Sequence, residues 1–454
     1  MPFRAVNPAT EEIIGSFPAH SASEIDARLA SAERAFDQWR RAPLAGRALH
    51  LRRCAELLEA ELPVIAQLMT SEMGKTFASA KGEVAKCASL LRYYAEHAPA
   101  MLESQAIATS GSQSGVRYEP LGVVLAVMPW NYPLWQVVRV LAPNLMAGNV
   151  VVVKHAPNVP GCARAIEELF VRSGFPQGCV VNLFAELDDV ARVVGDDRVA
   201  AVTLTGSERA GRTIGALAGR HLKKCVLELG GSDAFIVGHG ADLDDTVESA
   251  VSARLQNNGQ SCIAAKRFIV VEPLAEMFIE RFSDAMATVP TGDPMDPATE
   301  LGPLATRSQL DLLDEQVRSS IGAGAVVRTG ARPVGGPGYY YAATVLTDVA
   351  PDSRAAREEL FGPVAVVHVV ADVAAAIELA NASCFGLGAS IWSRDEAEIR
   401  SAIVGINGGM VFANALVASM AELPFGGVKN SGFGRELGVD GAREFTNVKS
   451  FFVA

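Results

Sequence analysis

A cysteine closes a polar, glycine-containing stretch past the middle of the chain. Residues 256–262 read Gln-Asn-Asn-Gly-Gln-Ser-Cys, between an apolar run of helical period and the strand-like run 268–271. A cysteine in this place is presented on a turn, which suits a nucleophilic thiol. A lone cysteine is more often a small buried hydrophobe. Cys262 is therefore a candidate nucleophile that needs support from other residues.

Two further side chains could serve the same reaction. Asn131 lies in the Pro-Trp-Asn-Tyr-Pro sequence of residues 129–133, whose two prolines restrict the turn. A rigid amide can donate to a developing oxyanion, although an Asx turn is the commoner use of asparagine. Glu228 lies in an apolar run before Gly230 and Gly231. Burial would raise the pKa of this carboxyl and make it a candidate base; a structural salt bridge is the alternative.

Two other stretches could bind a nucleotide. Residues 205–211, Thr-Gly-Ser-Glu-Arg-Ala-Gly, follow a strand-like run and open a helical one. Gly206 would let the backbone approach a phosphate at a helix N-terminus. The spacing is not Gly-x-Gly-x-x-Gly, so an ordinary strand–helix turn is an equal interpretation. Lys154 ends the apolar run 150–153, where a lysine can reach ribose or phosphate; a solvated lysine is the alternative.

The elements that must position these residues alternate between strand-like and helical runs from 121 to 237. The expected strands are 123–128, 150–153, 180–184, 199–204, 226–229 and 235–237. The expected helices between them are 134–147, 160–173, 187–195 and 208–219. This alternation predicts an α/β fold with a parallel, doubly wound sheet that is buried on both faces. Such sheets bind nucleotides at the carboxyl ends of their strands.

The flanking regions predict further elements. Ser23 is expected to cap a first amphipathic helix, and further helices are expected over 47–61, 63–73 and about 77–102. A second α/β series is expected from about 240 to 415. Its strands are expected near 268–271, 364–370, 388–391 and 410–412. Residues 104–120 and 450–453 have β-like patterns.

The length, the net charge and the cysteine spacing restrict the class to which this protein can belong. The chain has 454 residues, of which 49% are apolar and 20% charged, as in ordinary globular proteins. A net charge of −11 argues against nucleic acid or an anionic membrane as the main partner. The seven cysteines are far apart and form no Cys/His cluster with metal-ligand spacing, so no metal site is expected. Without a signal core or a long apolar run, the expected location is cytoplasmic.

Together these stretches resemble the aldehyde dehydrogenase superfamily, from about residue 3 to the C-terminus. The matching stretches are Pro-Trp-Asn-Tyr-Pro at 129–133, Glu-Leu-Gly-Gly at 228–231, Gly-Gln-Ser-Cys at 259–262, Glu-Glu-Leu-Phe-Gly-Pro at 358–363, and Pro-Phe-Gly-Gly-Val-Lys-Asn-Ser-Gly-Phe-Gly-Arg-Glu at 424–436. Residues 154–158 and 229–233 look like those of the short bacterial NAD(P)-dependent succinate-semialdehyde dehydrogenases.

The resemblance implies a catalytic role for four residues. Cys262 would attack the aldehyde carbon to give a thiohemiacetal, which would lose hydride to the nicotinamide and become a thioester. The Asn131 amide and the Cys262 backbone N–H would hold the oxyanion. Glu228 would activate the hydrolytic water, and Glu436 would support the water or proton path.

The resemblance also implies the cofactor residues. Trp130, Gly206 and Ser207 would line the pyrophosphate path, and Lys154 would take the adenosine ribose. Glu359 would hold the nicotinamide ribose, and Phe361 would pack beside the ring. NAD-preferring relatives often carry a glutamate three residues after the lysine, where this chain has Pro157. The missing carboxylate removes repulsion against a 2′-phosphate, and Lys154 and His155 could add attraction. The sequence thus predicts that NADP is accepted, with NAD left open.

The predicted substrate is succinate semialdehyde. Dedicated enzymes for it grip the distal carboxylate with two arginines and a serine. Arg139 matches the first arginine and Ser419 the serine, but Gln256 stands where the second arginine would be. The carboxylate could pair with Arg139 and hydrogen-bond to Gln256 and Ser419, with one charge fewer. Arg139 as a packing arginine is an equal interpretation.

Three alternatives have different sequence support. An aldehyde dehydrogenase for another aliphatic or aromatic aldehyde is favoured by Gln256 and opposed by Arg139. A CoA-acylating semialdehyde dehydrogenase is disfavoured because Glu228 supplies the hydrolytic base that such enzymes usually lack. A non-catalytic binding protein on the same fold is opposed by the presence of Cys262, Glu228 and Asn131 together.

The resemblance divides the chain into three parts. Residues 1–103 and 121–230 would form the NAD(P)-binding domain, and residues 231–434 the catalytic domain. Residues 104–120 and 435–454 would form a β arm for oligomerisation. Because an exposed β arm needs a partner edge, a homodimer or homotetramer is expected.

Overall fold

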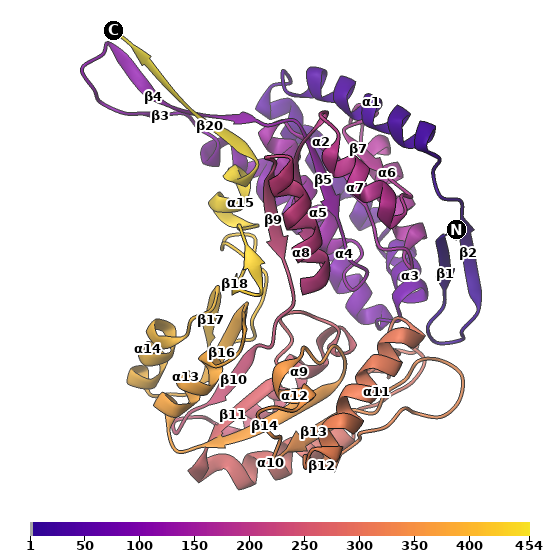
Figure 1. Cartoon of the computed structure of the whole chain (residues 1–454), viewed down its shortest axis with the longest axis vertical. Coiled ribbons are helices and arrows are strands. Elements are labelled where there is room, and N and C mark those ends of the chain that lie inside the picture. The colour runs from indigo at the N-terminus through magenta and orange to yellow at the C-terminus, as the bar shows by residue number, and fades with distance from the viewer. Residues whose placement is uncertain (1–2) are drawn as a thin grey trace.

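A six-stranded sheet forms the upper half of the molecule (Figure 1). The structure is a computed structural model that describes residues 3–454. The strand order is β19-β9-β8-β5-β6-β7, with bounds β5 (Val123–Val127), β6 (Val150–Lys154), β7 (Val180–Asn182), β8 (Val199–Thr205), β9 (Lys224–Glu228) and β19 (Gly432–Phe433). β5 to β9 are mutually parallel and β19 is an antiparallel edge. The predicted parallel, doubly wound sheet is confirmed.

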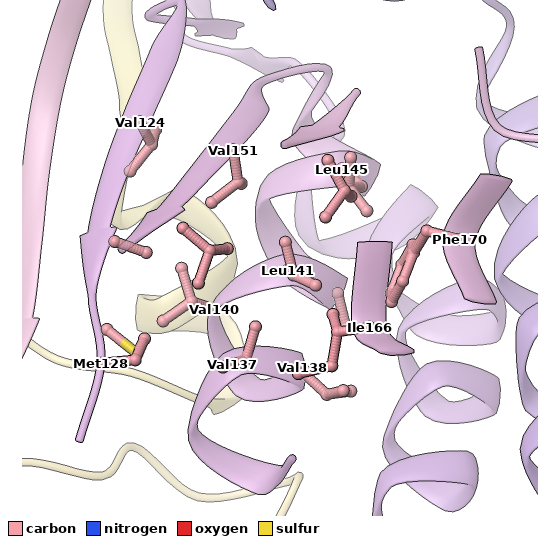
Figure 2. Packing of buried hydrophobic residues seen from close by; sticks show 14 of the residues in the cluster. Val124, Met128, Val137, Val138, Val140, Leu141, Leu145, Val151, Ile166 and Phe170 are labelled. Carbon is pink, nitrogen blue, oxygen red and sulfur yellow. The ribbon is translucent and has the colours of Figure 1, made fainter. Parts of the chain in front are cut away.

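Helices cover this sheet on both sides, as its continuously apolar strands require. They are α5 (Trp135–Ala147), α6 (Pro160–Arg172), α7 (Leu187–Gly195) and α8 (Glu208–Arg220). α5 is buried along its whole length. Figure 2 shows its side chain Leu141 between the strand residue Val151 and the α6 residues Ile166 and Phe170. α5 begins directly after the predicted Asn131 turn, so this packing fixes where the turn lies.

Four helices precede the sheet. They are α1 (Ala22–Trp39), α2 (Leu44–Ala60), α3 (Leu62–Met73) and α4 (Phe77–Met101). α4 packs on both α2 and α5. The prediction that Ser23 caps the first helix is wrong, because Ser21 is the N-cap and forms a capping box with Glu24. The antiparallel strands β1 (Phe3–Val6) and β2 (Ile13–Phe17) pair at the start of the described chain.

A seven-stranded sheet forms the lower half, in the order β12-β13-β14-β11-β10-β16-β17. Its strands are β10 (Ala234–Val237), β11 (Arg267–Val271), β12 (Val326–Thr329), β13 (Thr344–Thr347), β14 (Val364–Val370), β16 (Gly388–Trp392) and β17 (Met410–Ala413). Its helices are α9 (Leu243–Leu255), α10 (Glu272–Ala287), α11 (Arg307–Gly322), α12 (Arg354–Arg357), α13 (Val373–Asn381) and α14 (Glu396–Gly405). The expected second α/β series is therefore present.

One strand assignment needs correction. The expected strand 235–237 was grouped with the first series, but β10 pairs with β11 and β16 of the second sheet. The chain crosses between the two sheets at residues 229–233, directly after Glu228. The short strands β15 (Phe385–Gly386) and β18 (Val428–Lys429) pair beside this crossing.

A narrow three-stranded arm projects from the body and has the C-terminus at its tip (Figure 1). It consists of β3 (Gln105–Ala106), β4 (Gln113–Pro120) and β20 (Thr446–Val453), which follows α15 (Gly438–Glu444). β20 pairs antiparallel with β4 from Thr446↔Pro120 to Val453↔Gln113. The division into domains and an oligomerisation arm stays a prediction. No helix within residues 3–454 is both long and apolar enough to cross a membrane.

Candidate active site

A sharp turn after α9 presents Cys262. The one-turn 3-10 helix η1 (Gln256–Gly259) contains Asn257 and Asn258 at φ 56° and 59°, a left-handed conformation that asparagine tolerates better than most residues. Asn258 Nδ2 donates to the carbonyl oxygens of Gly74 at 2.9 Å and Pro303 at 3.0 Å. Its Oδ1 accepts from the Gly302 N–H at 3.0 Å. The turn is thus held by three bonds from one buried side chain.

Gly259 brings this turn against the 358–363 segment. Its φ is +73°, and a Cβ added there would lie 2.4 Å from the carbonyl carbon of Gly362. Only glycine fits so close an approach. The contact places Glu359 and Phe361 near Cys262, although about a hundred residues separate them in the chain.

Two buried cations that belong to none of the sequence motifs, Lys266 and Arg254, donate hydrogen bonds to the backbone around Cys262. Lys266 Nζ donates to the carbonyl oxygens of Ser261 at 2.8 Å and Cys262 at 2.6 Å, and lies 3.4 Å from Glu359 Oε1. Arg254 donates to the carbonyls of Ala265 at 2.6 Å and Gly259 at 2.7 Å. Their only sequence signal is a charged residue inside an apolar run.

Two hydrogen-bond donors lie ready beside the thiol. Asn131 Nδ2 donates one proton to the Gln260 carbonyl at 3.0 Å. Asn257 Nδ2 donates to the Asn131 carbonyl at 2.7 Å. Within residues 3–454 the second Asn131 amide proton and the Cys262 backbone N–H have no acceptor. Asn131 and Cys262 line one cavity, so both donors are available to an oxyanion.

A cavity of about 240 Å³ opens on one side of Cys262. It lies at the carboxyl ends of β5 and β8, where the strand order 3-2-1-4-5 of this sheet reverses, which is where doubly wound sheets bind ligands. We call it the cofactor cavity. Its lining includes six residues predicted to contact the cofactor or the oxyanion: Trp130, Asn131, Gly206, Ser207, Glu359 and Phe361.

A second cavity of about 230 Å³ opens on the other side of Cys262. We call it the substrate cavity. It brings together all three predicted substrate residues, Arg139, Gln256 and Ser419, and also Lys86, which the sequence analysis did not consider. Much of its remaining lining is apolar or aromatic, including Trp135, Ile263, Leu416 and Phe425. Cys262 therefore lines both cavities.

The predicted base lies in a buried carboxyl pair. Neither Glu228 oxygen has a hydrogen-bond partner within residues 3–454. Burial, and then the negative charge of Glu436, raise the pKa of Glu228 well above its ordinary value. Arg139 opposes this shift and forms an ion pair with Glu436. Neither Glu228 nor Glu436 lines either cavity. Other residues therefore separate this carboxyl pair from both cavities.

The thiol is also protonated in this state. Burial raises the pKa of Cys262 to about 12, against the opposing positive charges of Lys266 and Arg139. A thiolate is the nucleophilic form of cysteine. The site therefore holds its nucleophile neutral until a base removes the proton.

The family model for the aldehyde dehydrogenase family matches residues 1–451. The chain belongs to the aldehyde dehydrogenase family. It is 51% identical over 457 residues to succinate-semialdehyde dehydrogenase [NADP(+)] 1 of Mycobacterium ulcerans (strain Agy99), with 100% of both chains covered. It is 50% identical to the protein of the same name from Mycobacterium tuberculosis (strain ATCC 25618 / H37Rv), again with 100% of both covered.

Solved structures agree with this assignment. The crystal structure of succinic semialdehyde dehydrogenase from Streptococcus pyogenes, in complex with NADP+, matches with a TM-score of 0.97. That protein is 37% identical, and the match covers 99% of each chain. The predicted aldehyde dehydrogenase-like α/β fold is confirmed.

Lys154 and His155 lie outside the lining of the cofactor cavity of this family member. Lys154 ends β6 with a buried side chain, burial lowers its pKa, and it does not line the cofactor cavity. The prediction that His155 adds positive charge near a 2′-phosphate is wrong. Burial lowers the pKa of His155 to about 4. Its Nδ1 accepts from the Ala156 N–H, and its Nε2 therefore donates to the Pro133 carbonyl, each at 2.8 Å.

Two further observations complete the site of this aldehyde dehydrogenase. Within residues 3–454 no group of three or more His, Cys, Asp or Glu side chains is arranged to hold a metal ion. Gln256 lines the substrate cavity, but its Nε2 lies 3.5 Å from the Ala253 carbonyl and 3.4 Å from that of Ile263. Its amide protons thus point toward the loop backbone.

Proposed function

We propose that this protein oxidises succinate semialdehyde to succinate with NADP as the hydride acceptor. The observation that supports this most directly is the position of Cys262 between two cavities. One is lined by the predicted dinucleotide residues and the other by Arg139 and Ser419. Relatives about half identical over the whole chain bear the name of this activity.

The chain's own residues account for the acylation step. After the Cys262 thiol has released its proton to water, the thiolate sulfur forms a bond to the aldehyde carbon, and the carbonyl oxygen takes up the negative charge. Asn131 Nδ2 and the Cys262 N–H are the donors for this oxyanion. Each such donor is worth about 10²–10³ in kcat. NADP, when bound, accepts the hydride that leaves the same carbon, so that a thioester remains on Cys262.

Glu228 is assigned the hydrolytic step. As a carboxylate it takes a proton from water, whose oxygen attacks the thioester carbon, and the carbon–sulfur bond breaks to release the acid. Since burial raises the pKa of Glu228, its carboxylate form is less populated at a given pH than that of an exposed glutamate. Glu436 and Arg139 adjoin Glu228, and we assign Glu436 to the proton path.

The cofactor cavity fits a dinucleotide. Gly206 and the N-cap Ser207 open α8, whose N-terminus favours a phosphate. The rings of Trp130 and Phe361 meet edge to face at 5.7 Å and wall the cavity. A Cβ at Gly230 would lie 2.5 Å from Glu359 Oε2, so glycine leaves this carboxylate its place beside a nicotinamide ribose.

NADP is proposed as the preferred cofactor and NAD as an accepted one. Pro157 follows β6 where a carboxylate would repel a 2′-phosphate, and it is exposed. Lys154 is then the remaining cation of the 154–158 segment. With saturating aldehyde, kcat/KM for NADP should exceed that for NAD. Pro157→Glu should reverse the order, because it restores the repulsion.

The presence of Arg139 in the lining of the substrate cavity favours an aldehyde that carries a carboxylate. The Nη2 atom of Arg139 is buried and has no hydrogen-bond partner within residues 3–454, although Nε pairs with Glu436. Arg139 lines the substrate cavity, so a carboxylate in that cavity would lie near its guanidinium charge. The second candidate is an uncharged aldehyde, which Gln256 and the apolar lining favour.

The test compares kcat/KM for succinate semialdehyde and butanal, each with NADP and NAD. A preference of about tenfold or more for succinate semialdehyde, equivalent to about 1.4 kcal/mol, is expected. Equal values would remove the substrate and leave only aldehyde oxidation. Cys262→Ala should abolish both activities; residual NADP reduction by that variant would contradict the assigned nucleophile.

We also propose that the β3–β4–β20 arm joins copies of this chain into a homodimer or homotetramer. β20 is an edge strand of its sheet, and Val448, Phe452 and Val453 are exposed on it. Exposed apolar edges pair readily with another strand. Light scattering should give a dimer or tetramer, and a chain ending at residue 445 should give a smaller species.

A further inference from the structure

A lysine outside every sequence motif points into the substrate cavity. Lys86 is on α4, and its Nζ donates to Ser419 Oγ at 2.8 Å. The same nitrogen lies 4.1 Å from the centroid of the Trp135 ring on α5. Lys86 and Arg139 line one cavity with the nucleophile Cys262. A second cation therefore faces the place where the far end of an aldehyde bound to Cys262 would lie.

The charge of Lys86 has no counterion within residues 3–454. The nearest acidic residue on the same helix, Glu83, already has other partners. Glu83 pairs with the buried Lys75 and accepts from the N–H groups of Leu134 at 2.9 Å and Trp135 at 2.8 Å. Lys86 is an exposed residue, so its ammonium is open to a ligand, and no carboxylate within residues 3–454 forms an ion pair with it.

The nearby charges favour an anion at this point. Desolvation by the surrounding protein, and then the positive charge of Arg139, lower the pKa of Lys86 to about 8, although Lys86 as a whole residue is exposed. Lys86 and Arg139 line the same cavity, so their positive charges repel each other when the cavity holds no anion. A carboxylate between them removes that repulsion and gains two charge-assisted bonds.

We propose that Lys86 is a specificity-determining residue that supplies the second positive charge for the substrate's distal carboxylate. This inference rests on the proposed function. It identifies the cation that takes the place of the second arginine, since position 256 is a glutamine in this chain. The cation comes from α4, in the N-terminal part of the chain, and the loop that presents Cys262 does not supply it.

Ser419 completes the arrangement. Its Oγ accepts a hydrogen bond from the Lys86 ammonium. The Ser419 hydroxyl can therefore donate its own proton in a hydrogen bond to a ligand. Trp135 holds the ammonium over its ring by a cation–π contact. The carboxylate would then lie near Lys86, the Ser419 hydroxyl and the Arg139 guanidinium, all of which line the same cavity. Like the set of two arginines and a serine in dedicated enzymes, this set provides two positive charges and a hydroxyl. Here one of the two charges comes from a lysine on α4.

The experiment uses the full-length enzyme with NADP and the two aldehydes, succinate semialdehyde and butanal. The readout is the ratio of their kcat/KM values in wild type, Lys86→Met and Lys86→Arg. Lys86→Met should lower the ratio about tenfold or more, mainly through a higher KM for succinate semialdehyde, and Lys86→Arg should restore most of it. Lys81→Met is the matched control, because Lys81 is on the same helix outside the cavity, with its Nζ 4.9 Å from the centroid of the Phe77 ring.

The outcomes separate this inference from the proposed function. If wild type prefers succinate semialdehyde and Lys86→Met keeps that preference, Lys86 plays no part and Arg139 alone recognises the carboxylate. If wild type has no preference, the proposed substrate and the role of Lys86 both fall. Should Lys86→Met fail to fold, Lys86→Gln in the same assay decides, since glutamine keeps a donor to Ser419 but lacks the charge.

Discussion

Lys266 Nζ donates a hydrogen bond to the carbonyl oxygen of Cys262 at 2.6 Å. A second bond to the carbonyl of Ser261, at 2.8 Å, fixes both peptide groups around the nucleophile. The same ammonium lies 3.4 Å from Glu359 Oε1. One buried lysine thus orients the residue that attacks the aldehyde and the residue assigned to the cofactor ribose.

Lys266→Met should weaken catalysis and stability together. It leaves buried carbonyls without a donor and Glu359 without its cation, which costs about 1–3 kcal/mol for each unsatisfied group. We expect kcat to fall at least about tenfold, with a clear drop in Tm. Arg400→Met is the control, because the Arg400–Glu396 pair is exposed and such pairs contribute about 0–1 kcal/mol. Wild-type kcat in Lys266→Met would refute the positioning role.

Asn131→Ala should affect chemistry much more than cofactor binding. The variant loses one of the two proposed oxyanion donors, so kcat should fall about 10²–10³-fold. NADP affinity, measured by fluorescence titration, should change little, because Asn131 is assigned to the oxyanion and not to the cofactor. A fall of less than about fivefold in kcat would mean that the Cys262 N–H suffices.

Glu228 should make the enzyme less stable as the pH rises. A carboxyl whose folded pKa is raised holds its proton in the folded state after the unfolded chain has lost it. Folding therefore costs free energy at every pH above the ordinary value of about 4.5, and this cost grows up to the raised folded pKa. Glu228→Gln is neutral in both states. Its Tm should exceed that of wild type at pH 8 by more than at pH 5.

The same variant tests the hydrolytic role. Without a base at position 228, the thioester on Cys262 should accumulate, so stopped-flow traces should show a burst of NADPH followed by slow turnover. In wild type, deacylation should speed up as the pH rises, because ionised Glu228 is the active form. A Glu228→Gln enzyme with normal steady-state turnover would assign the base elsewhere.

Lys86 should make recognition of succinate semialdehyde depend on pH. Its pKa of about 8 in the empty site means that the ammonium is lost as the pH rises through this value. KM for succinate semialdehyde should therefore increase above about pH 8. The groups that face Lys86 are Arg139 on α5 and Glu83 and Cys87 on α4, and burial raises the pKa of Cys87 well above its ordinary value.

Lys86→Arg provides the control for that profile. Arginine keeps its charge over the whole range, so KM for succinate semialdehyde in this variant should stay flat where that of wild type rises. Butanal lacks the carboxylate, and its KM should not follow the Lys86 titration in either protein. Identical profiles for the two enzymes would assign the titration to another group.

Local sequence determined the elements and the chemistry-bearing turns of this protein. Apolar runs and punctuating glycines predict the strands and helices because burial on both faces leaves a pattern in the chain itself. Cys262, Asn131 and the Gly206–Ser207 turn were found because each follows such a run. The N-cap was missed by two residues, since Ser21 and Ser23 look equivalent until the helix start is known.

Tertiary structure decided what lies between distant segments. The strand β10 looks like its neighbours in sequence, and only its pairing with β11 and β16 places it in the second sheet. His155 reads as a possible cation, but burial and two hydrogen bonds keep it neutral. Lys86 and Ser419 are 333 residues apart, and no local pattern links them. The packing of α4 against α5 brings Lys86 to the cavity that Arg139 lines, and the segment between β17 and β18 brings Ser419 to the same cavity.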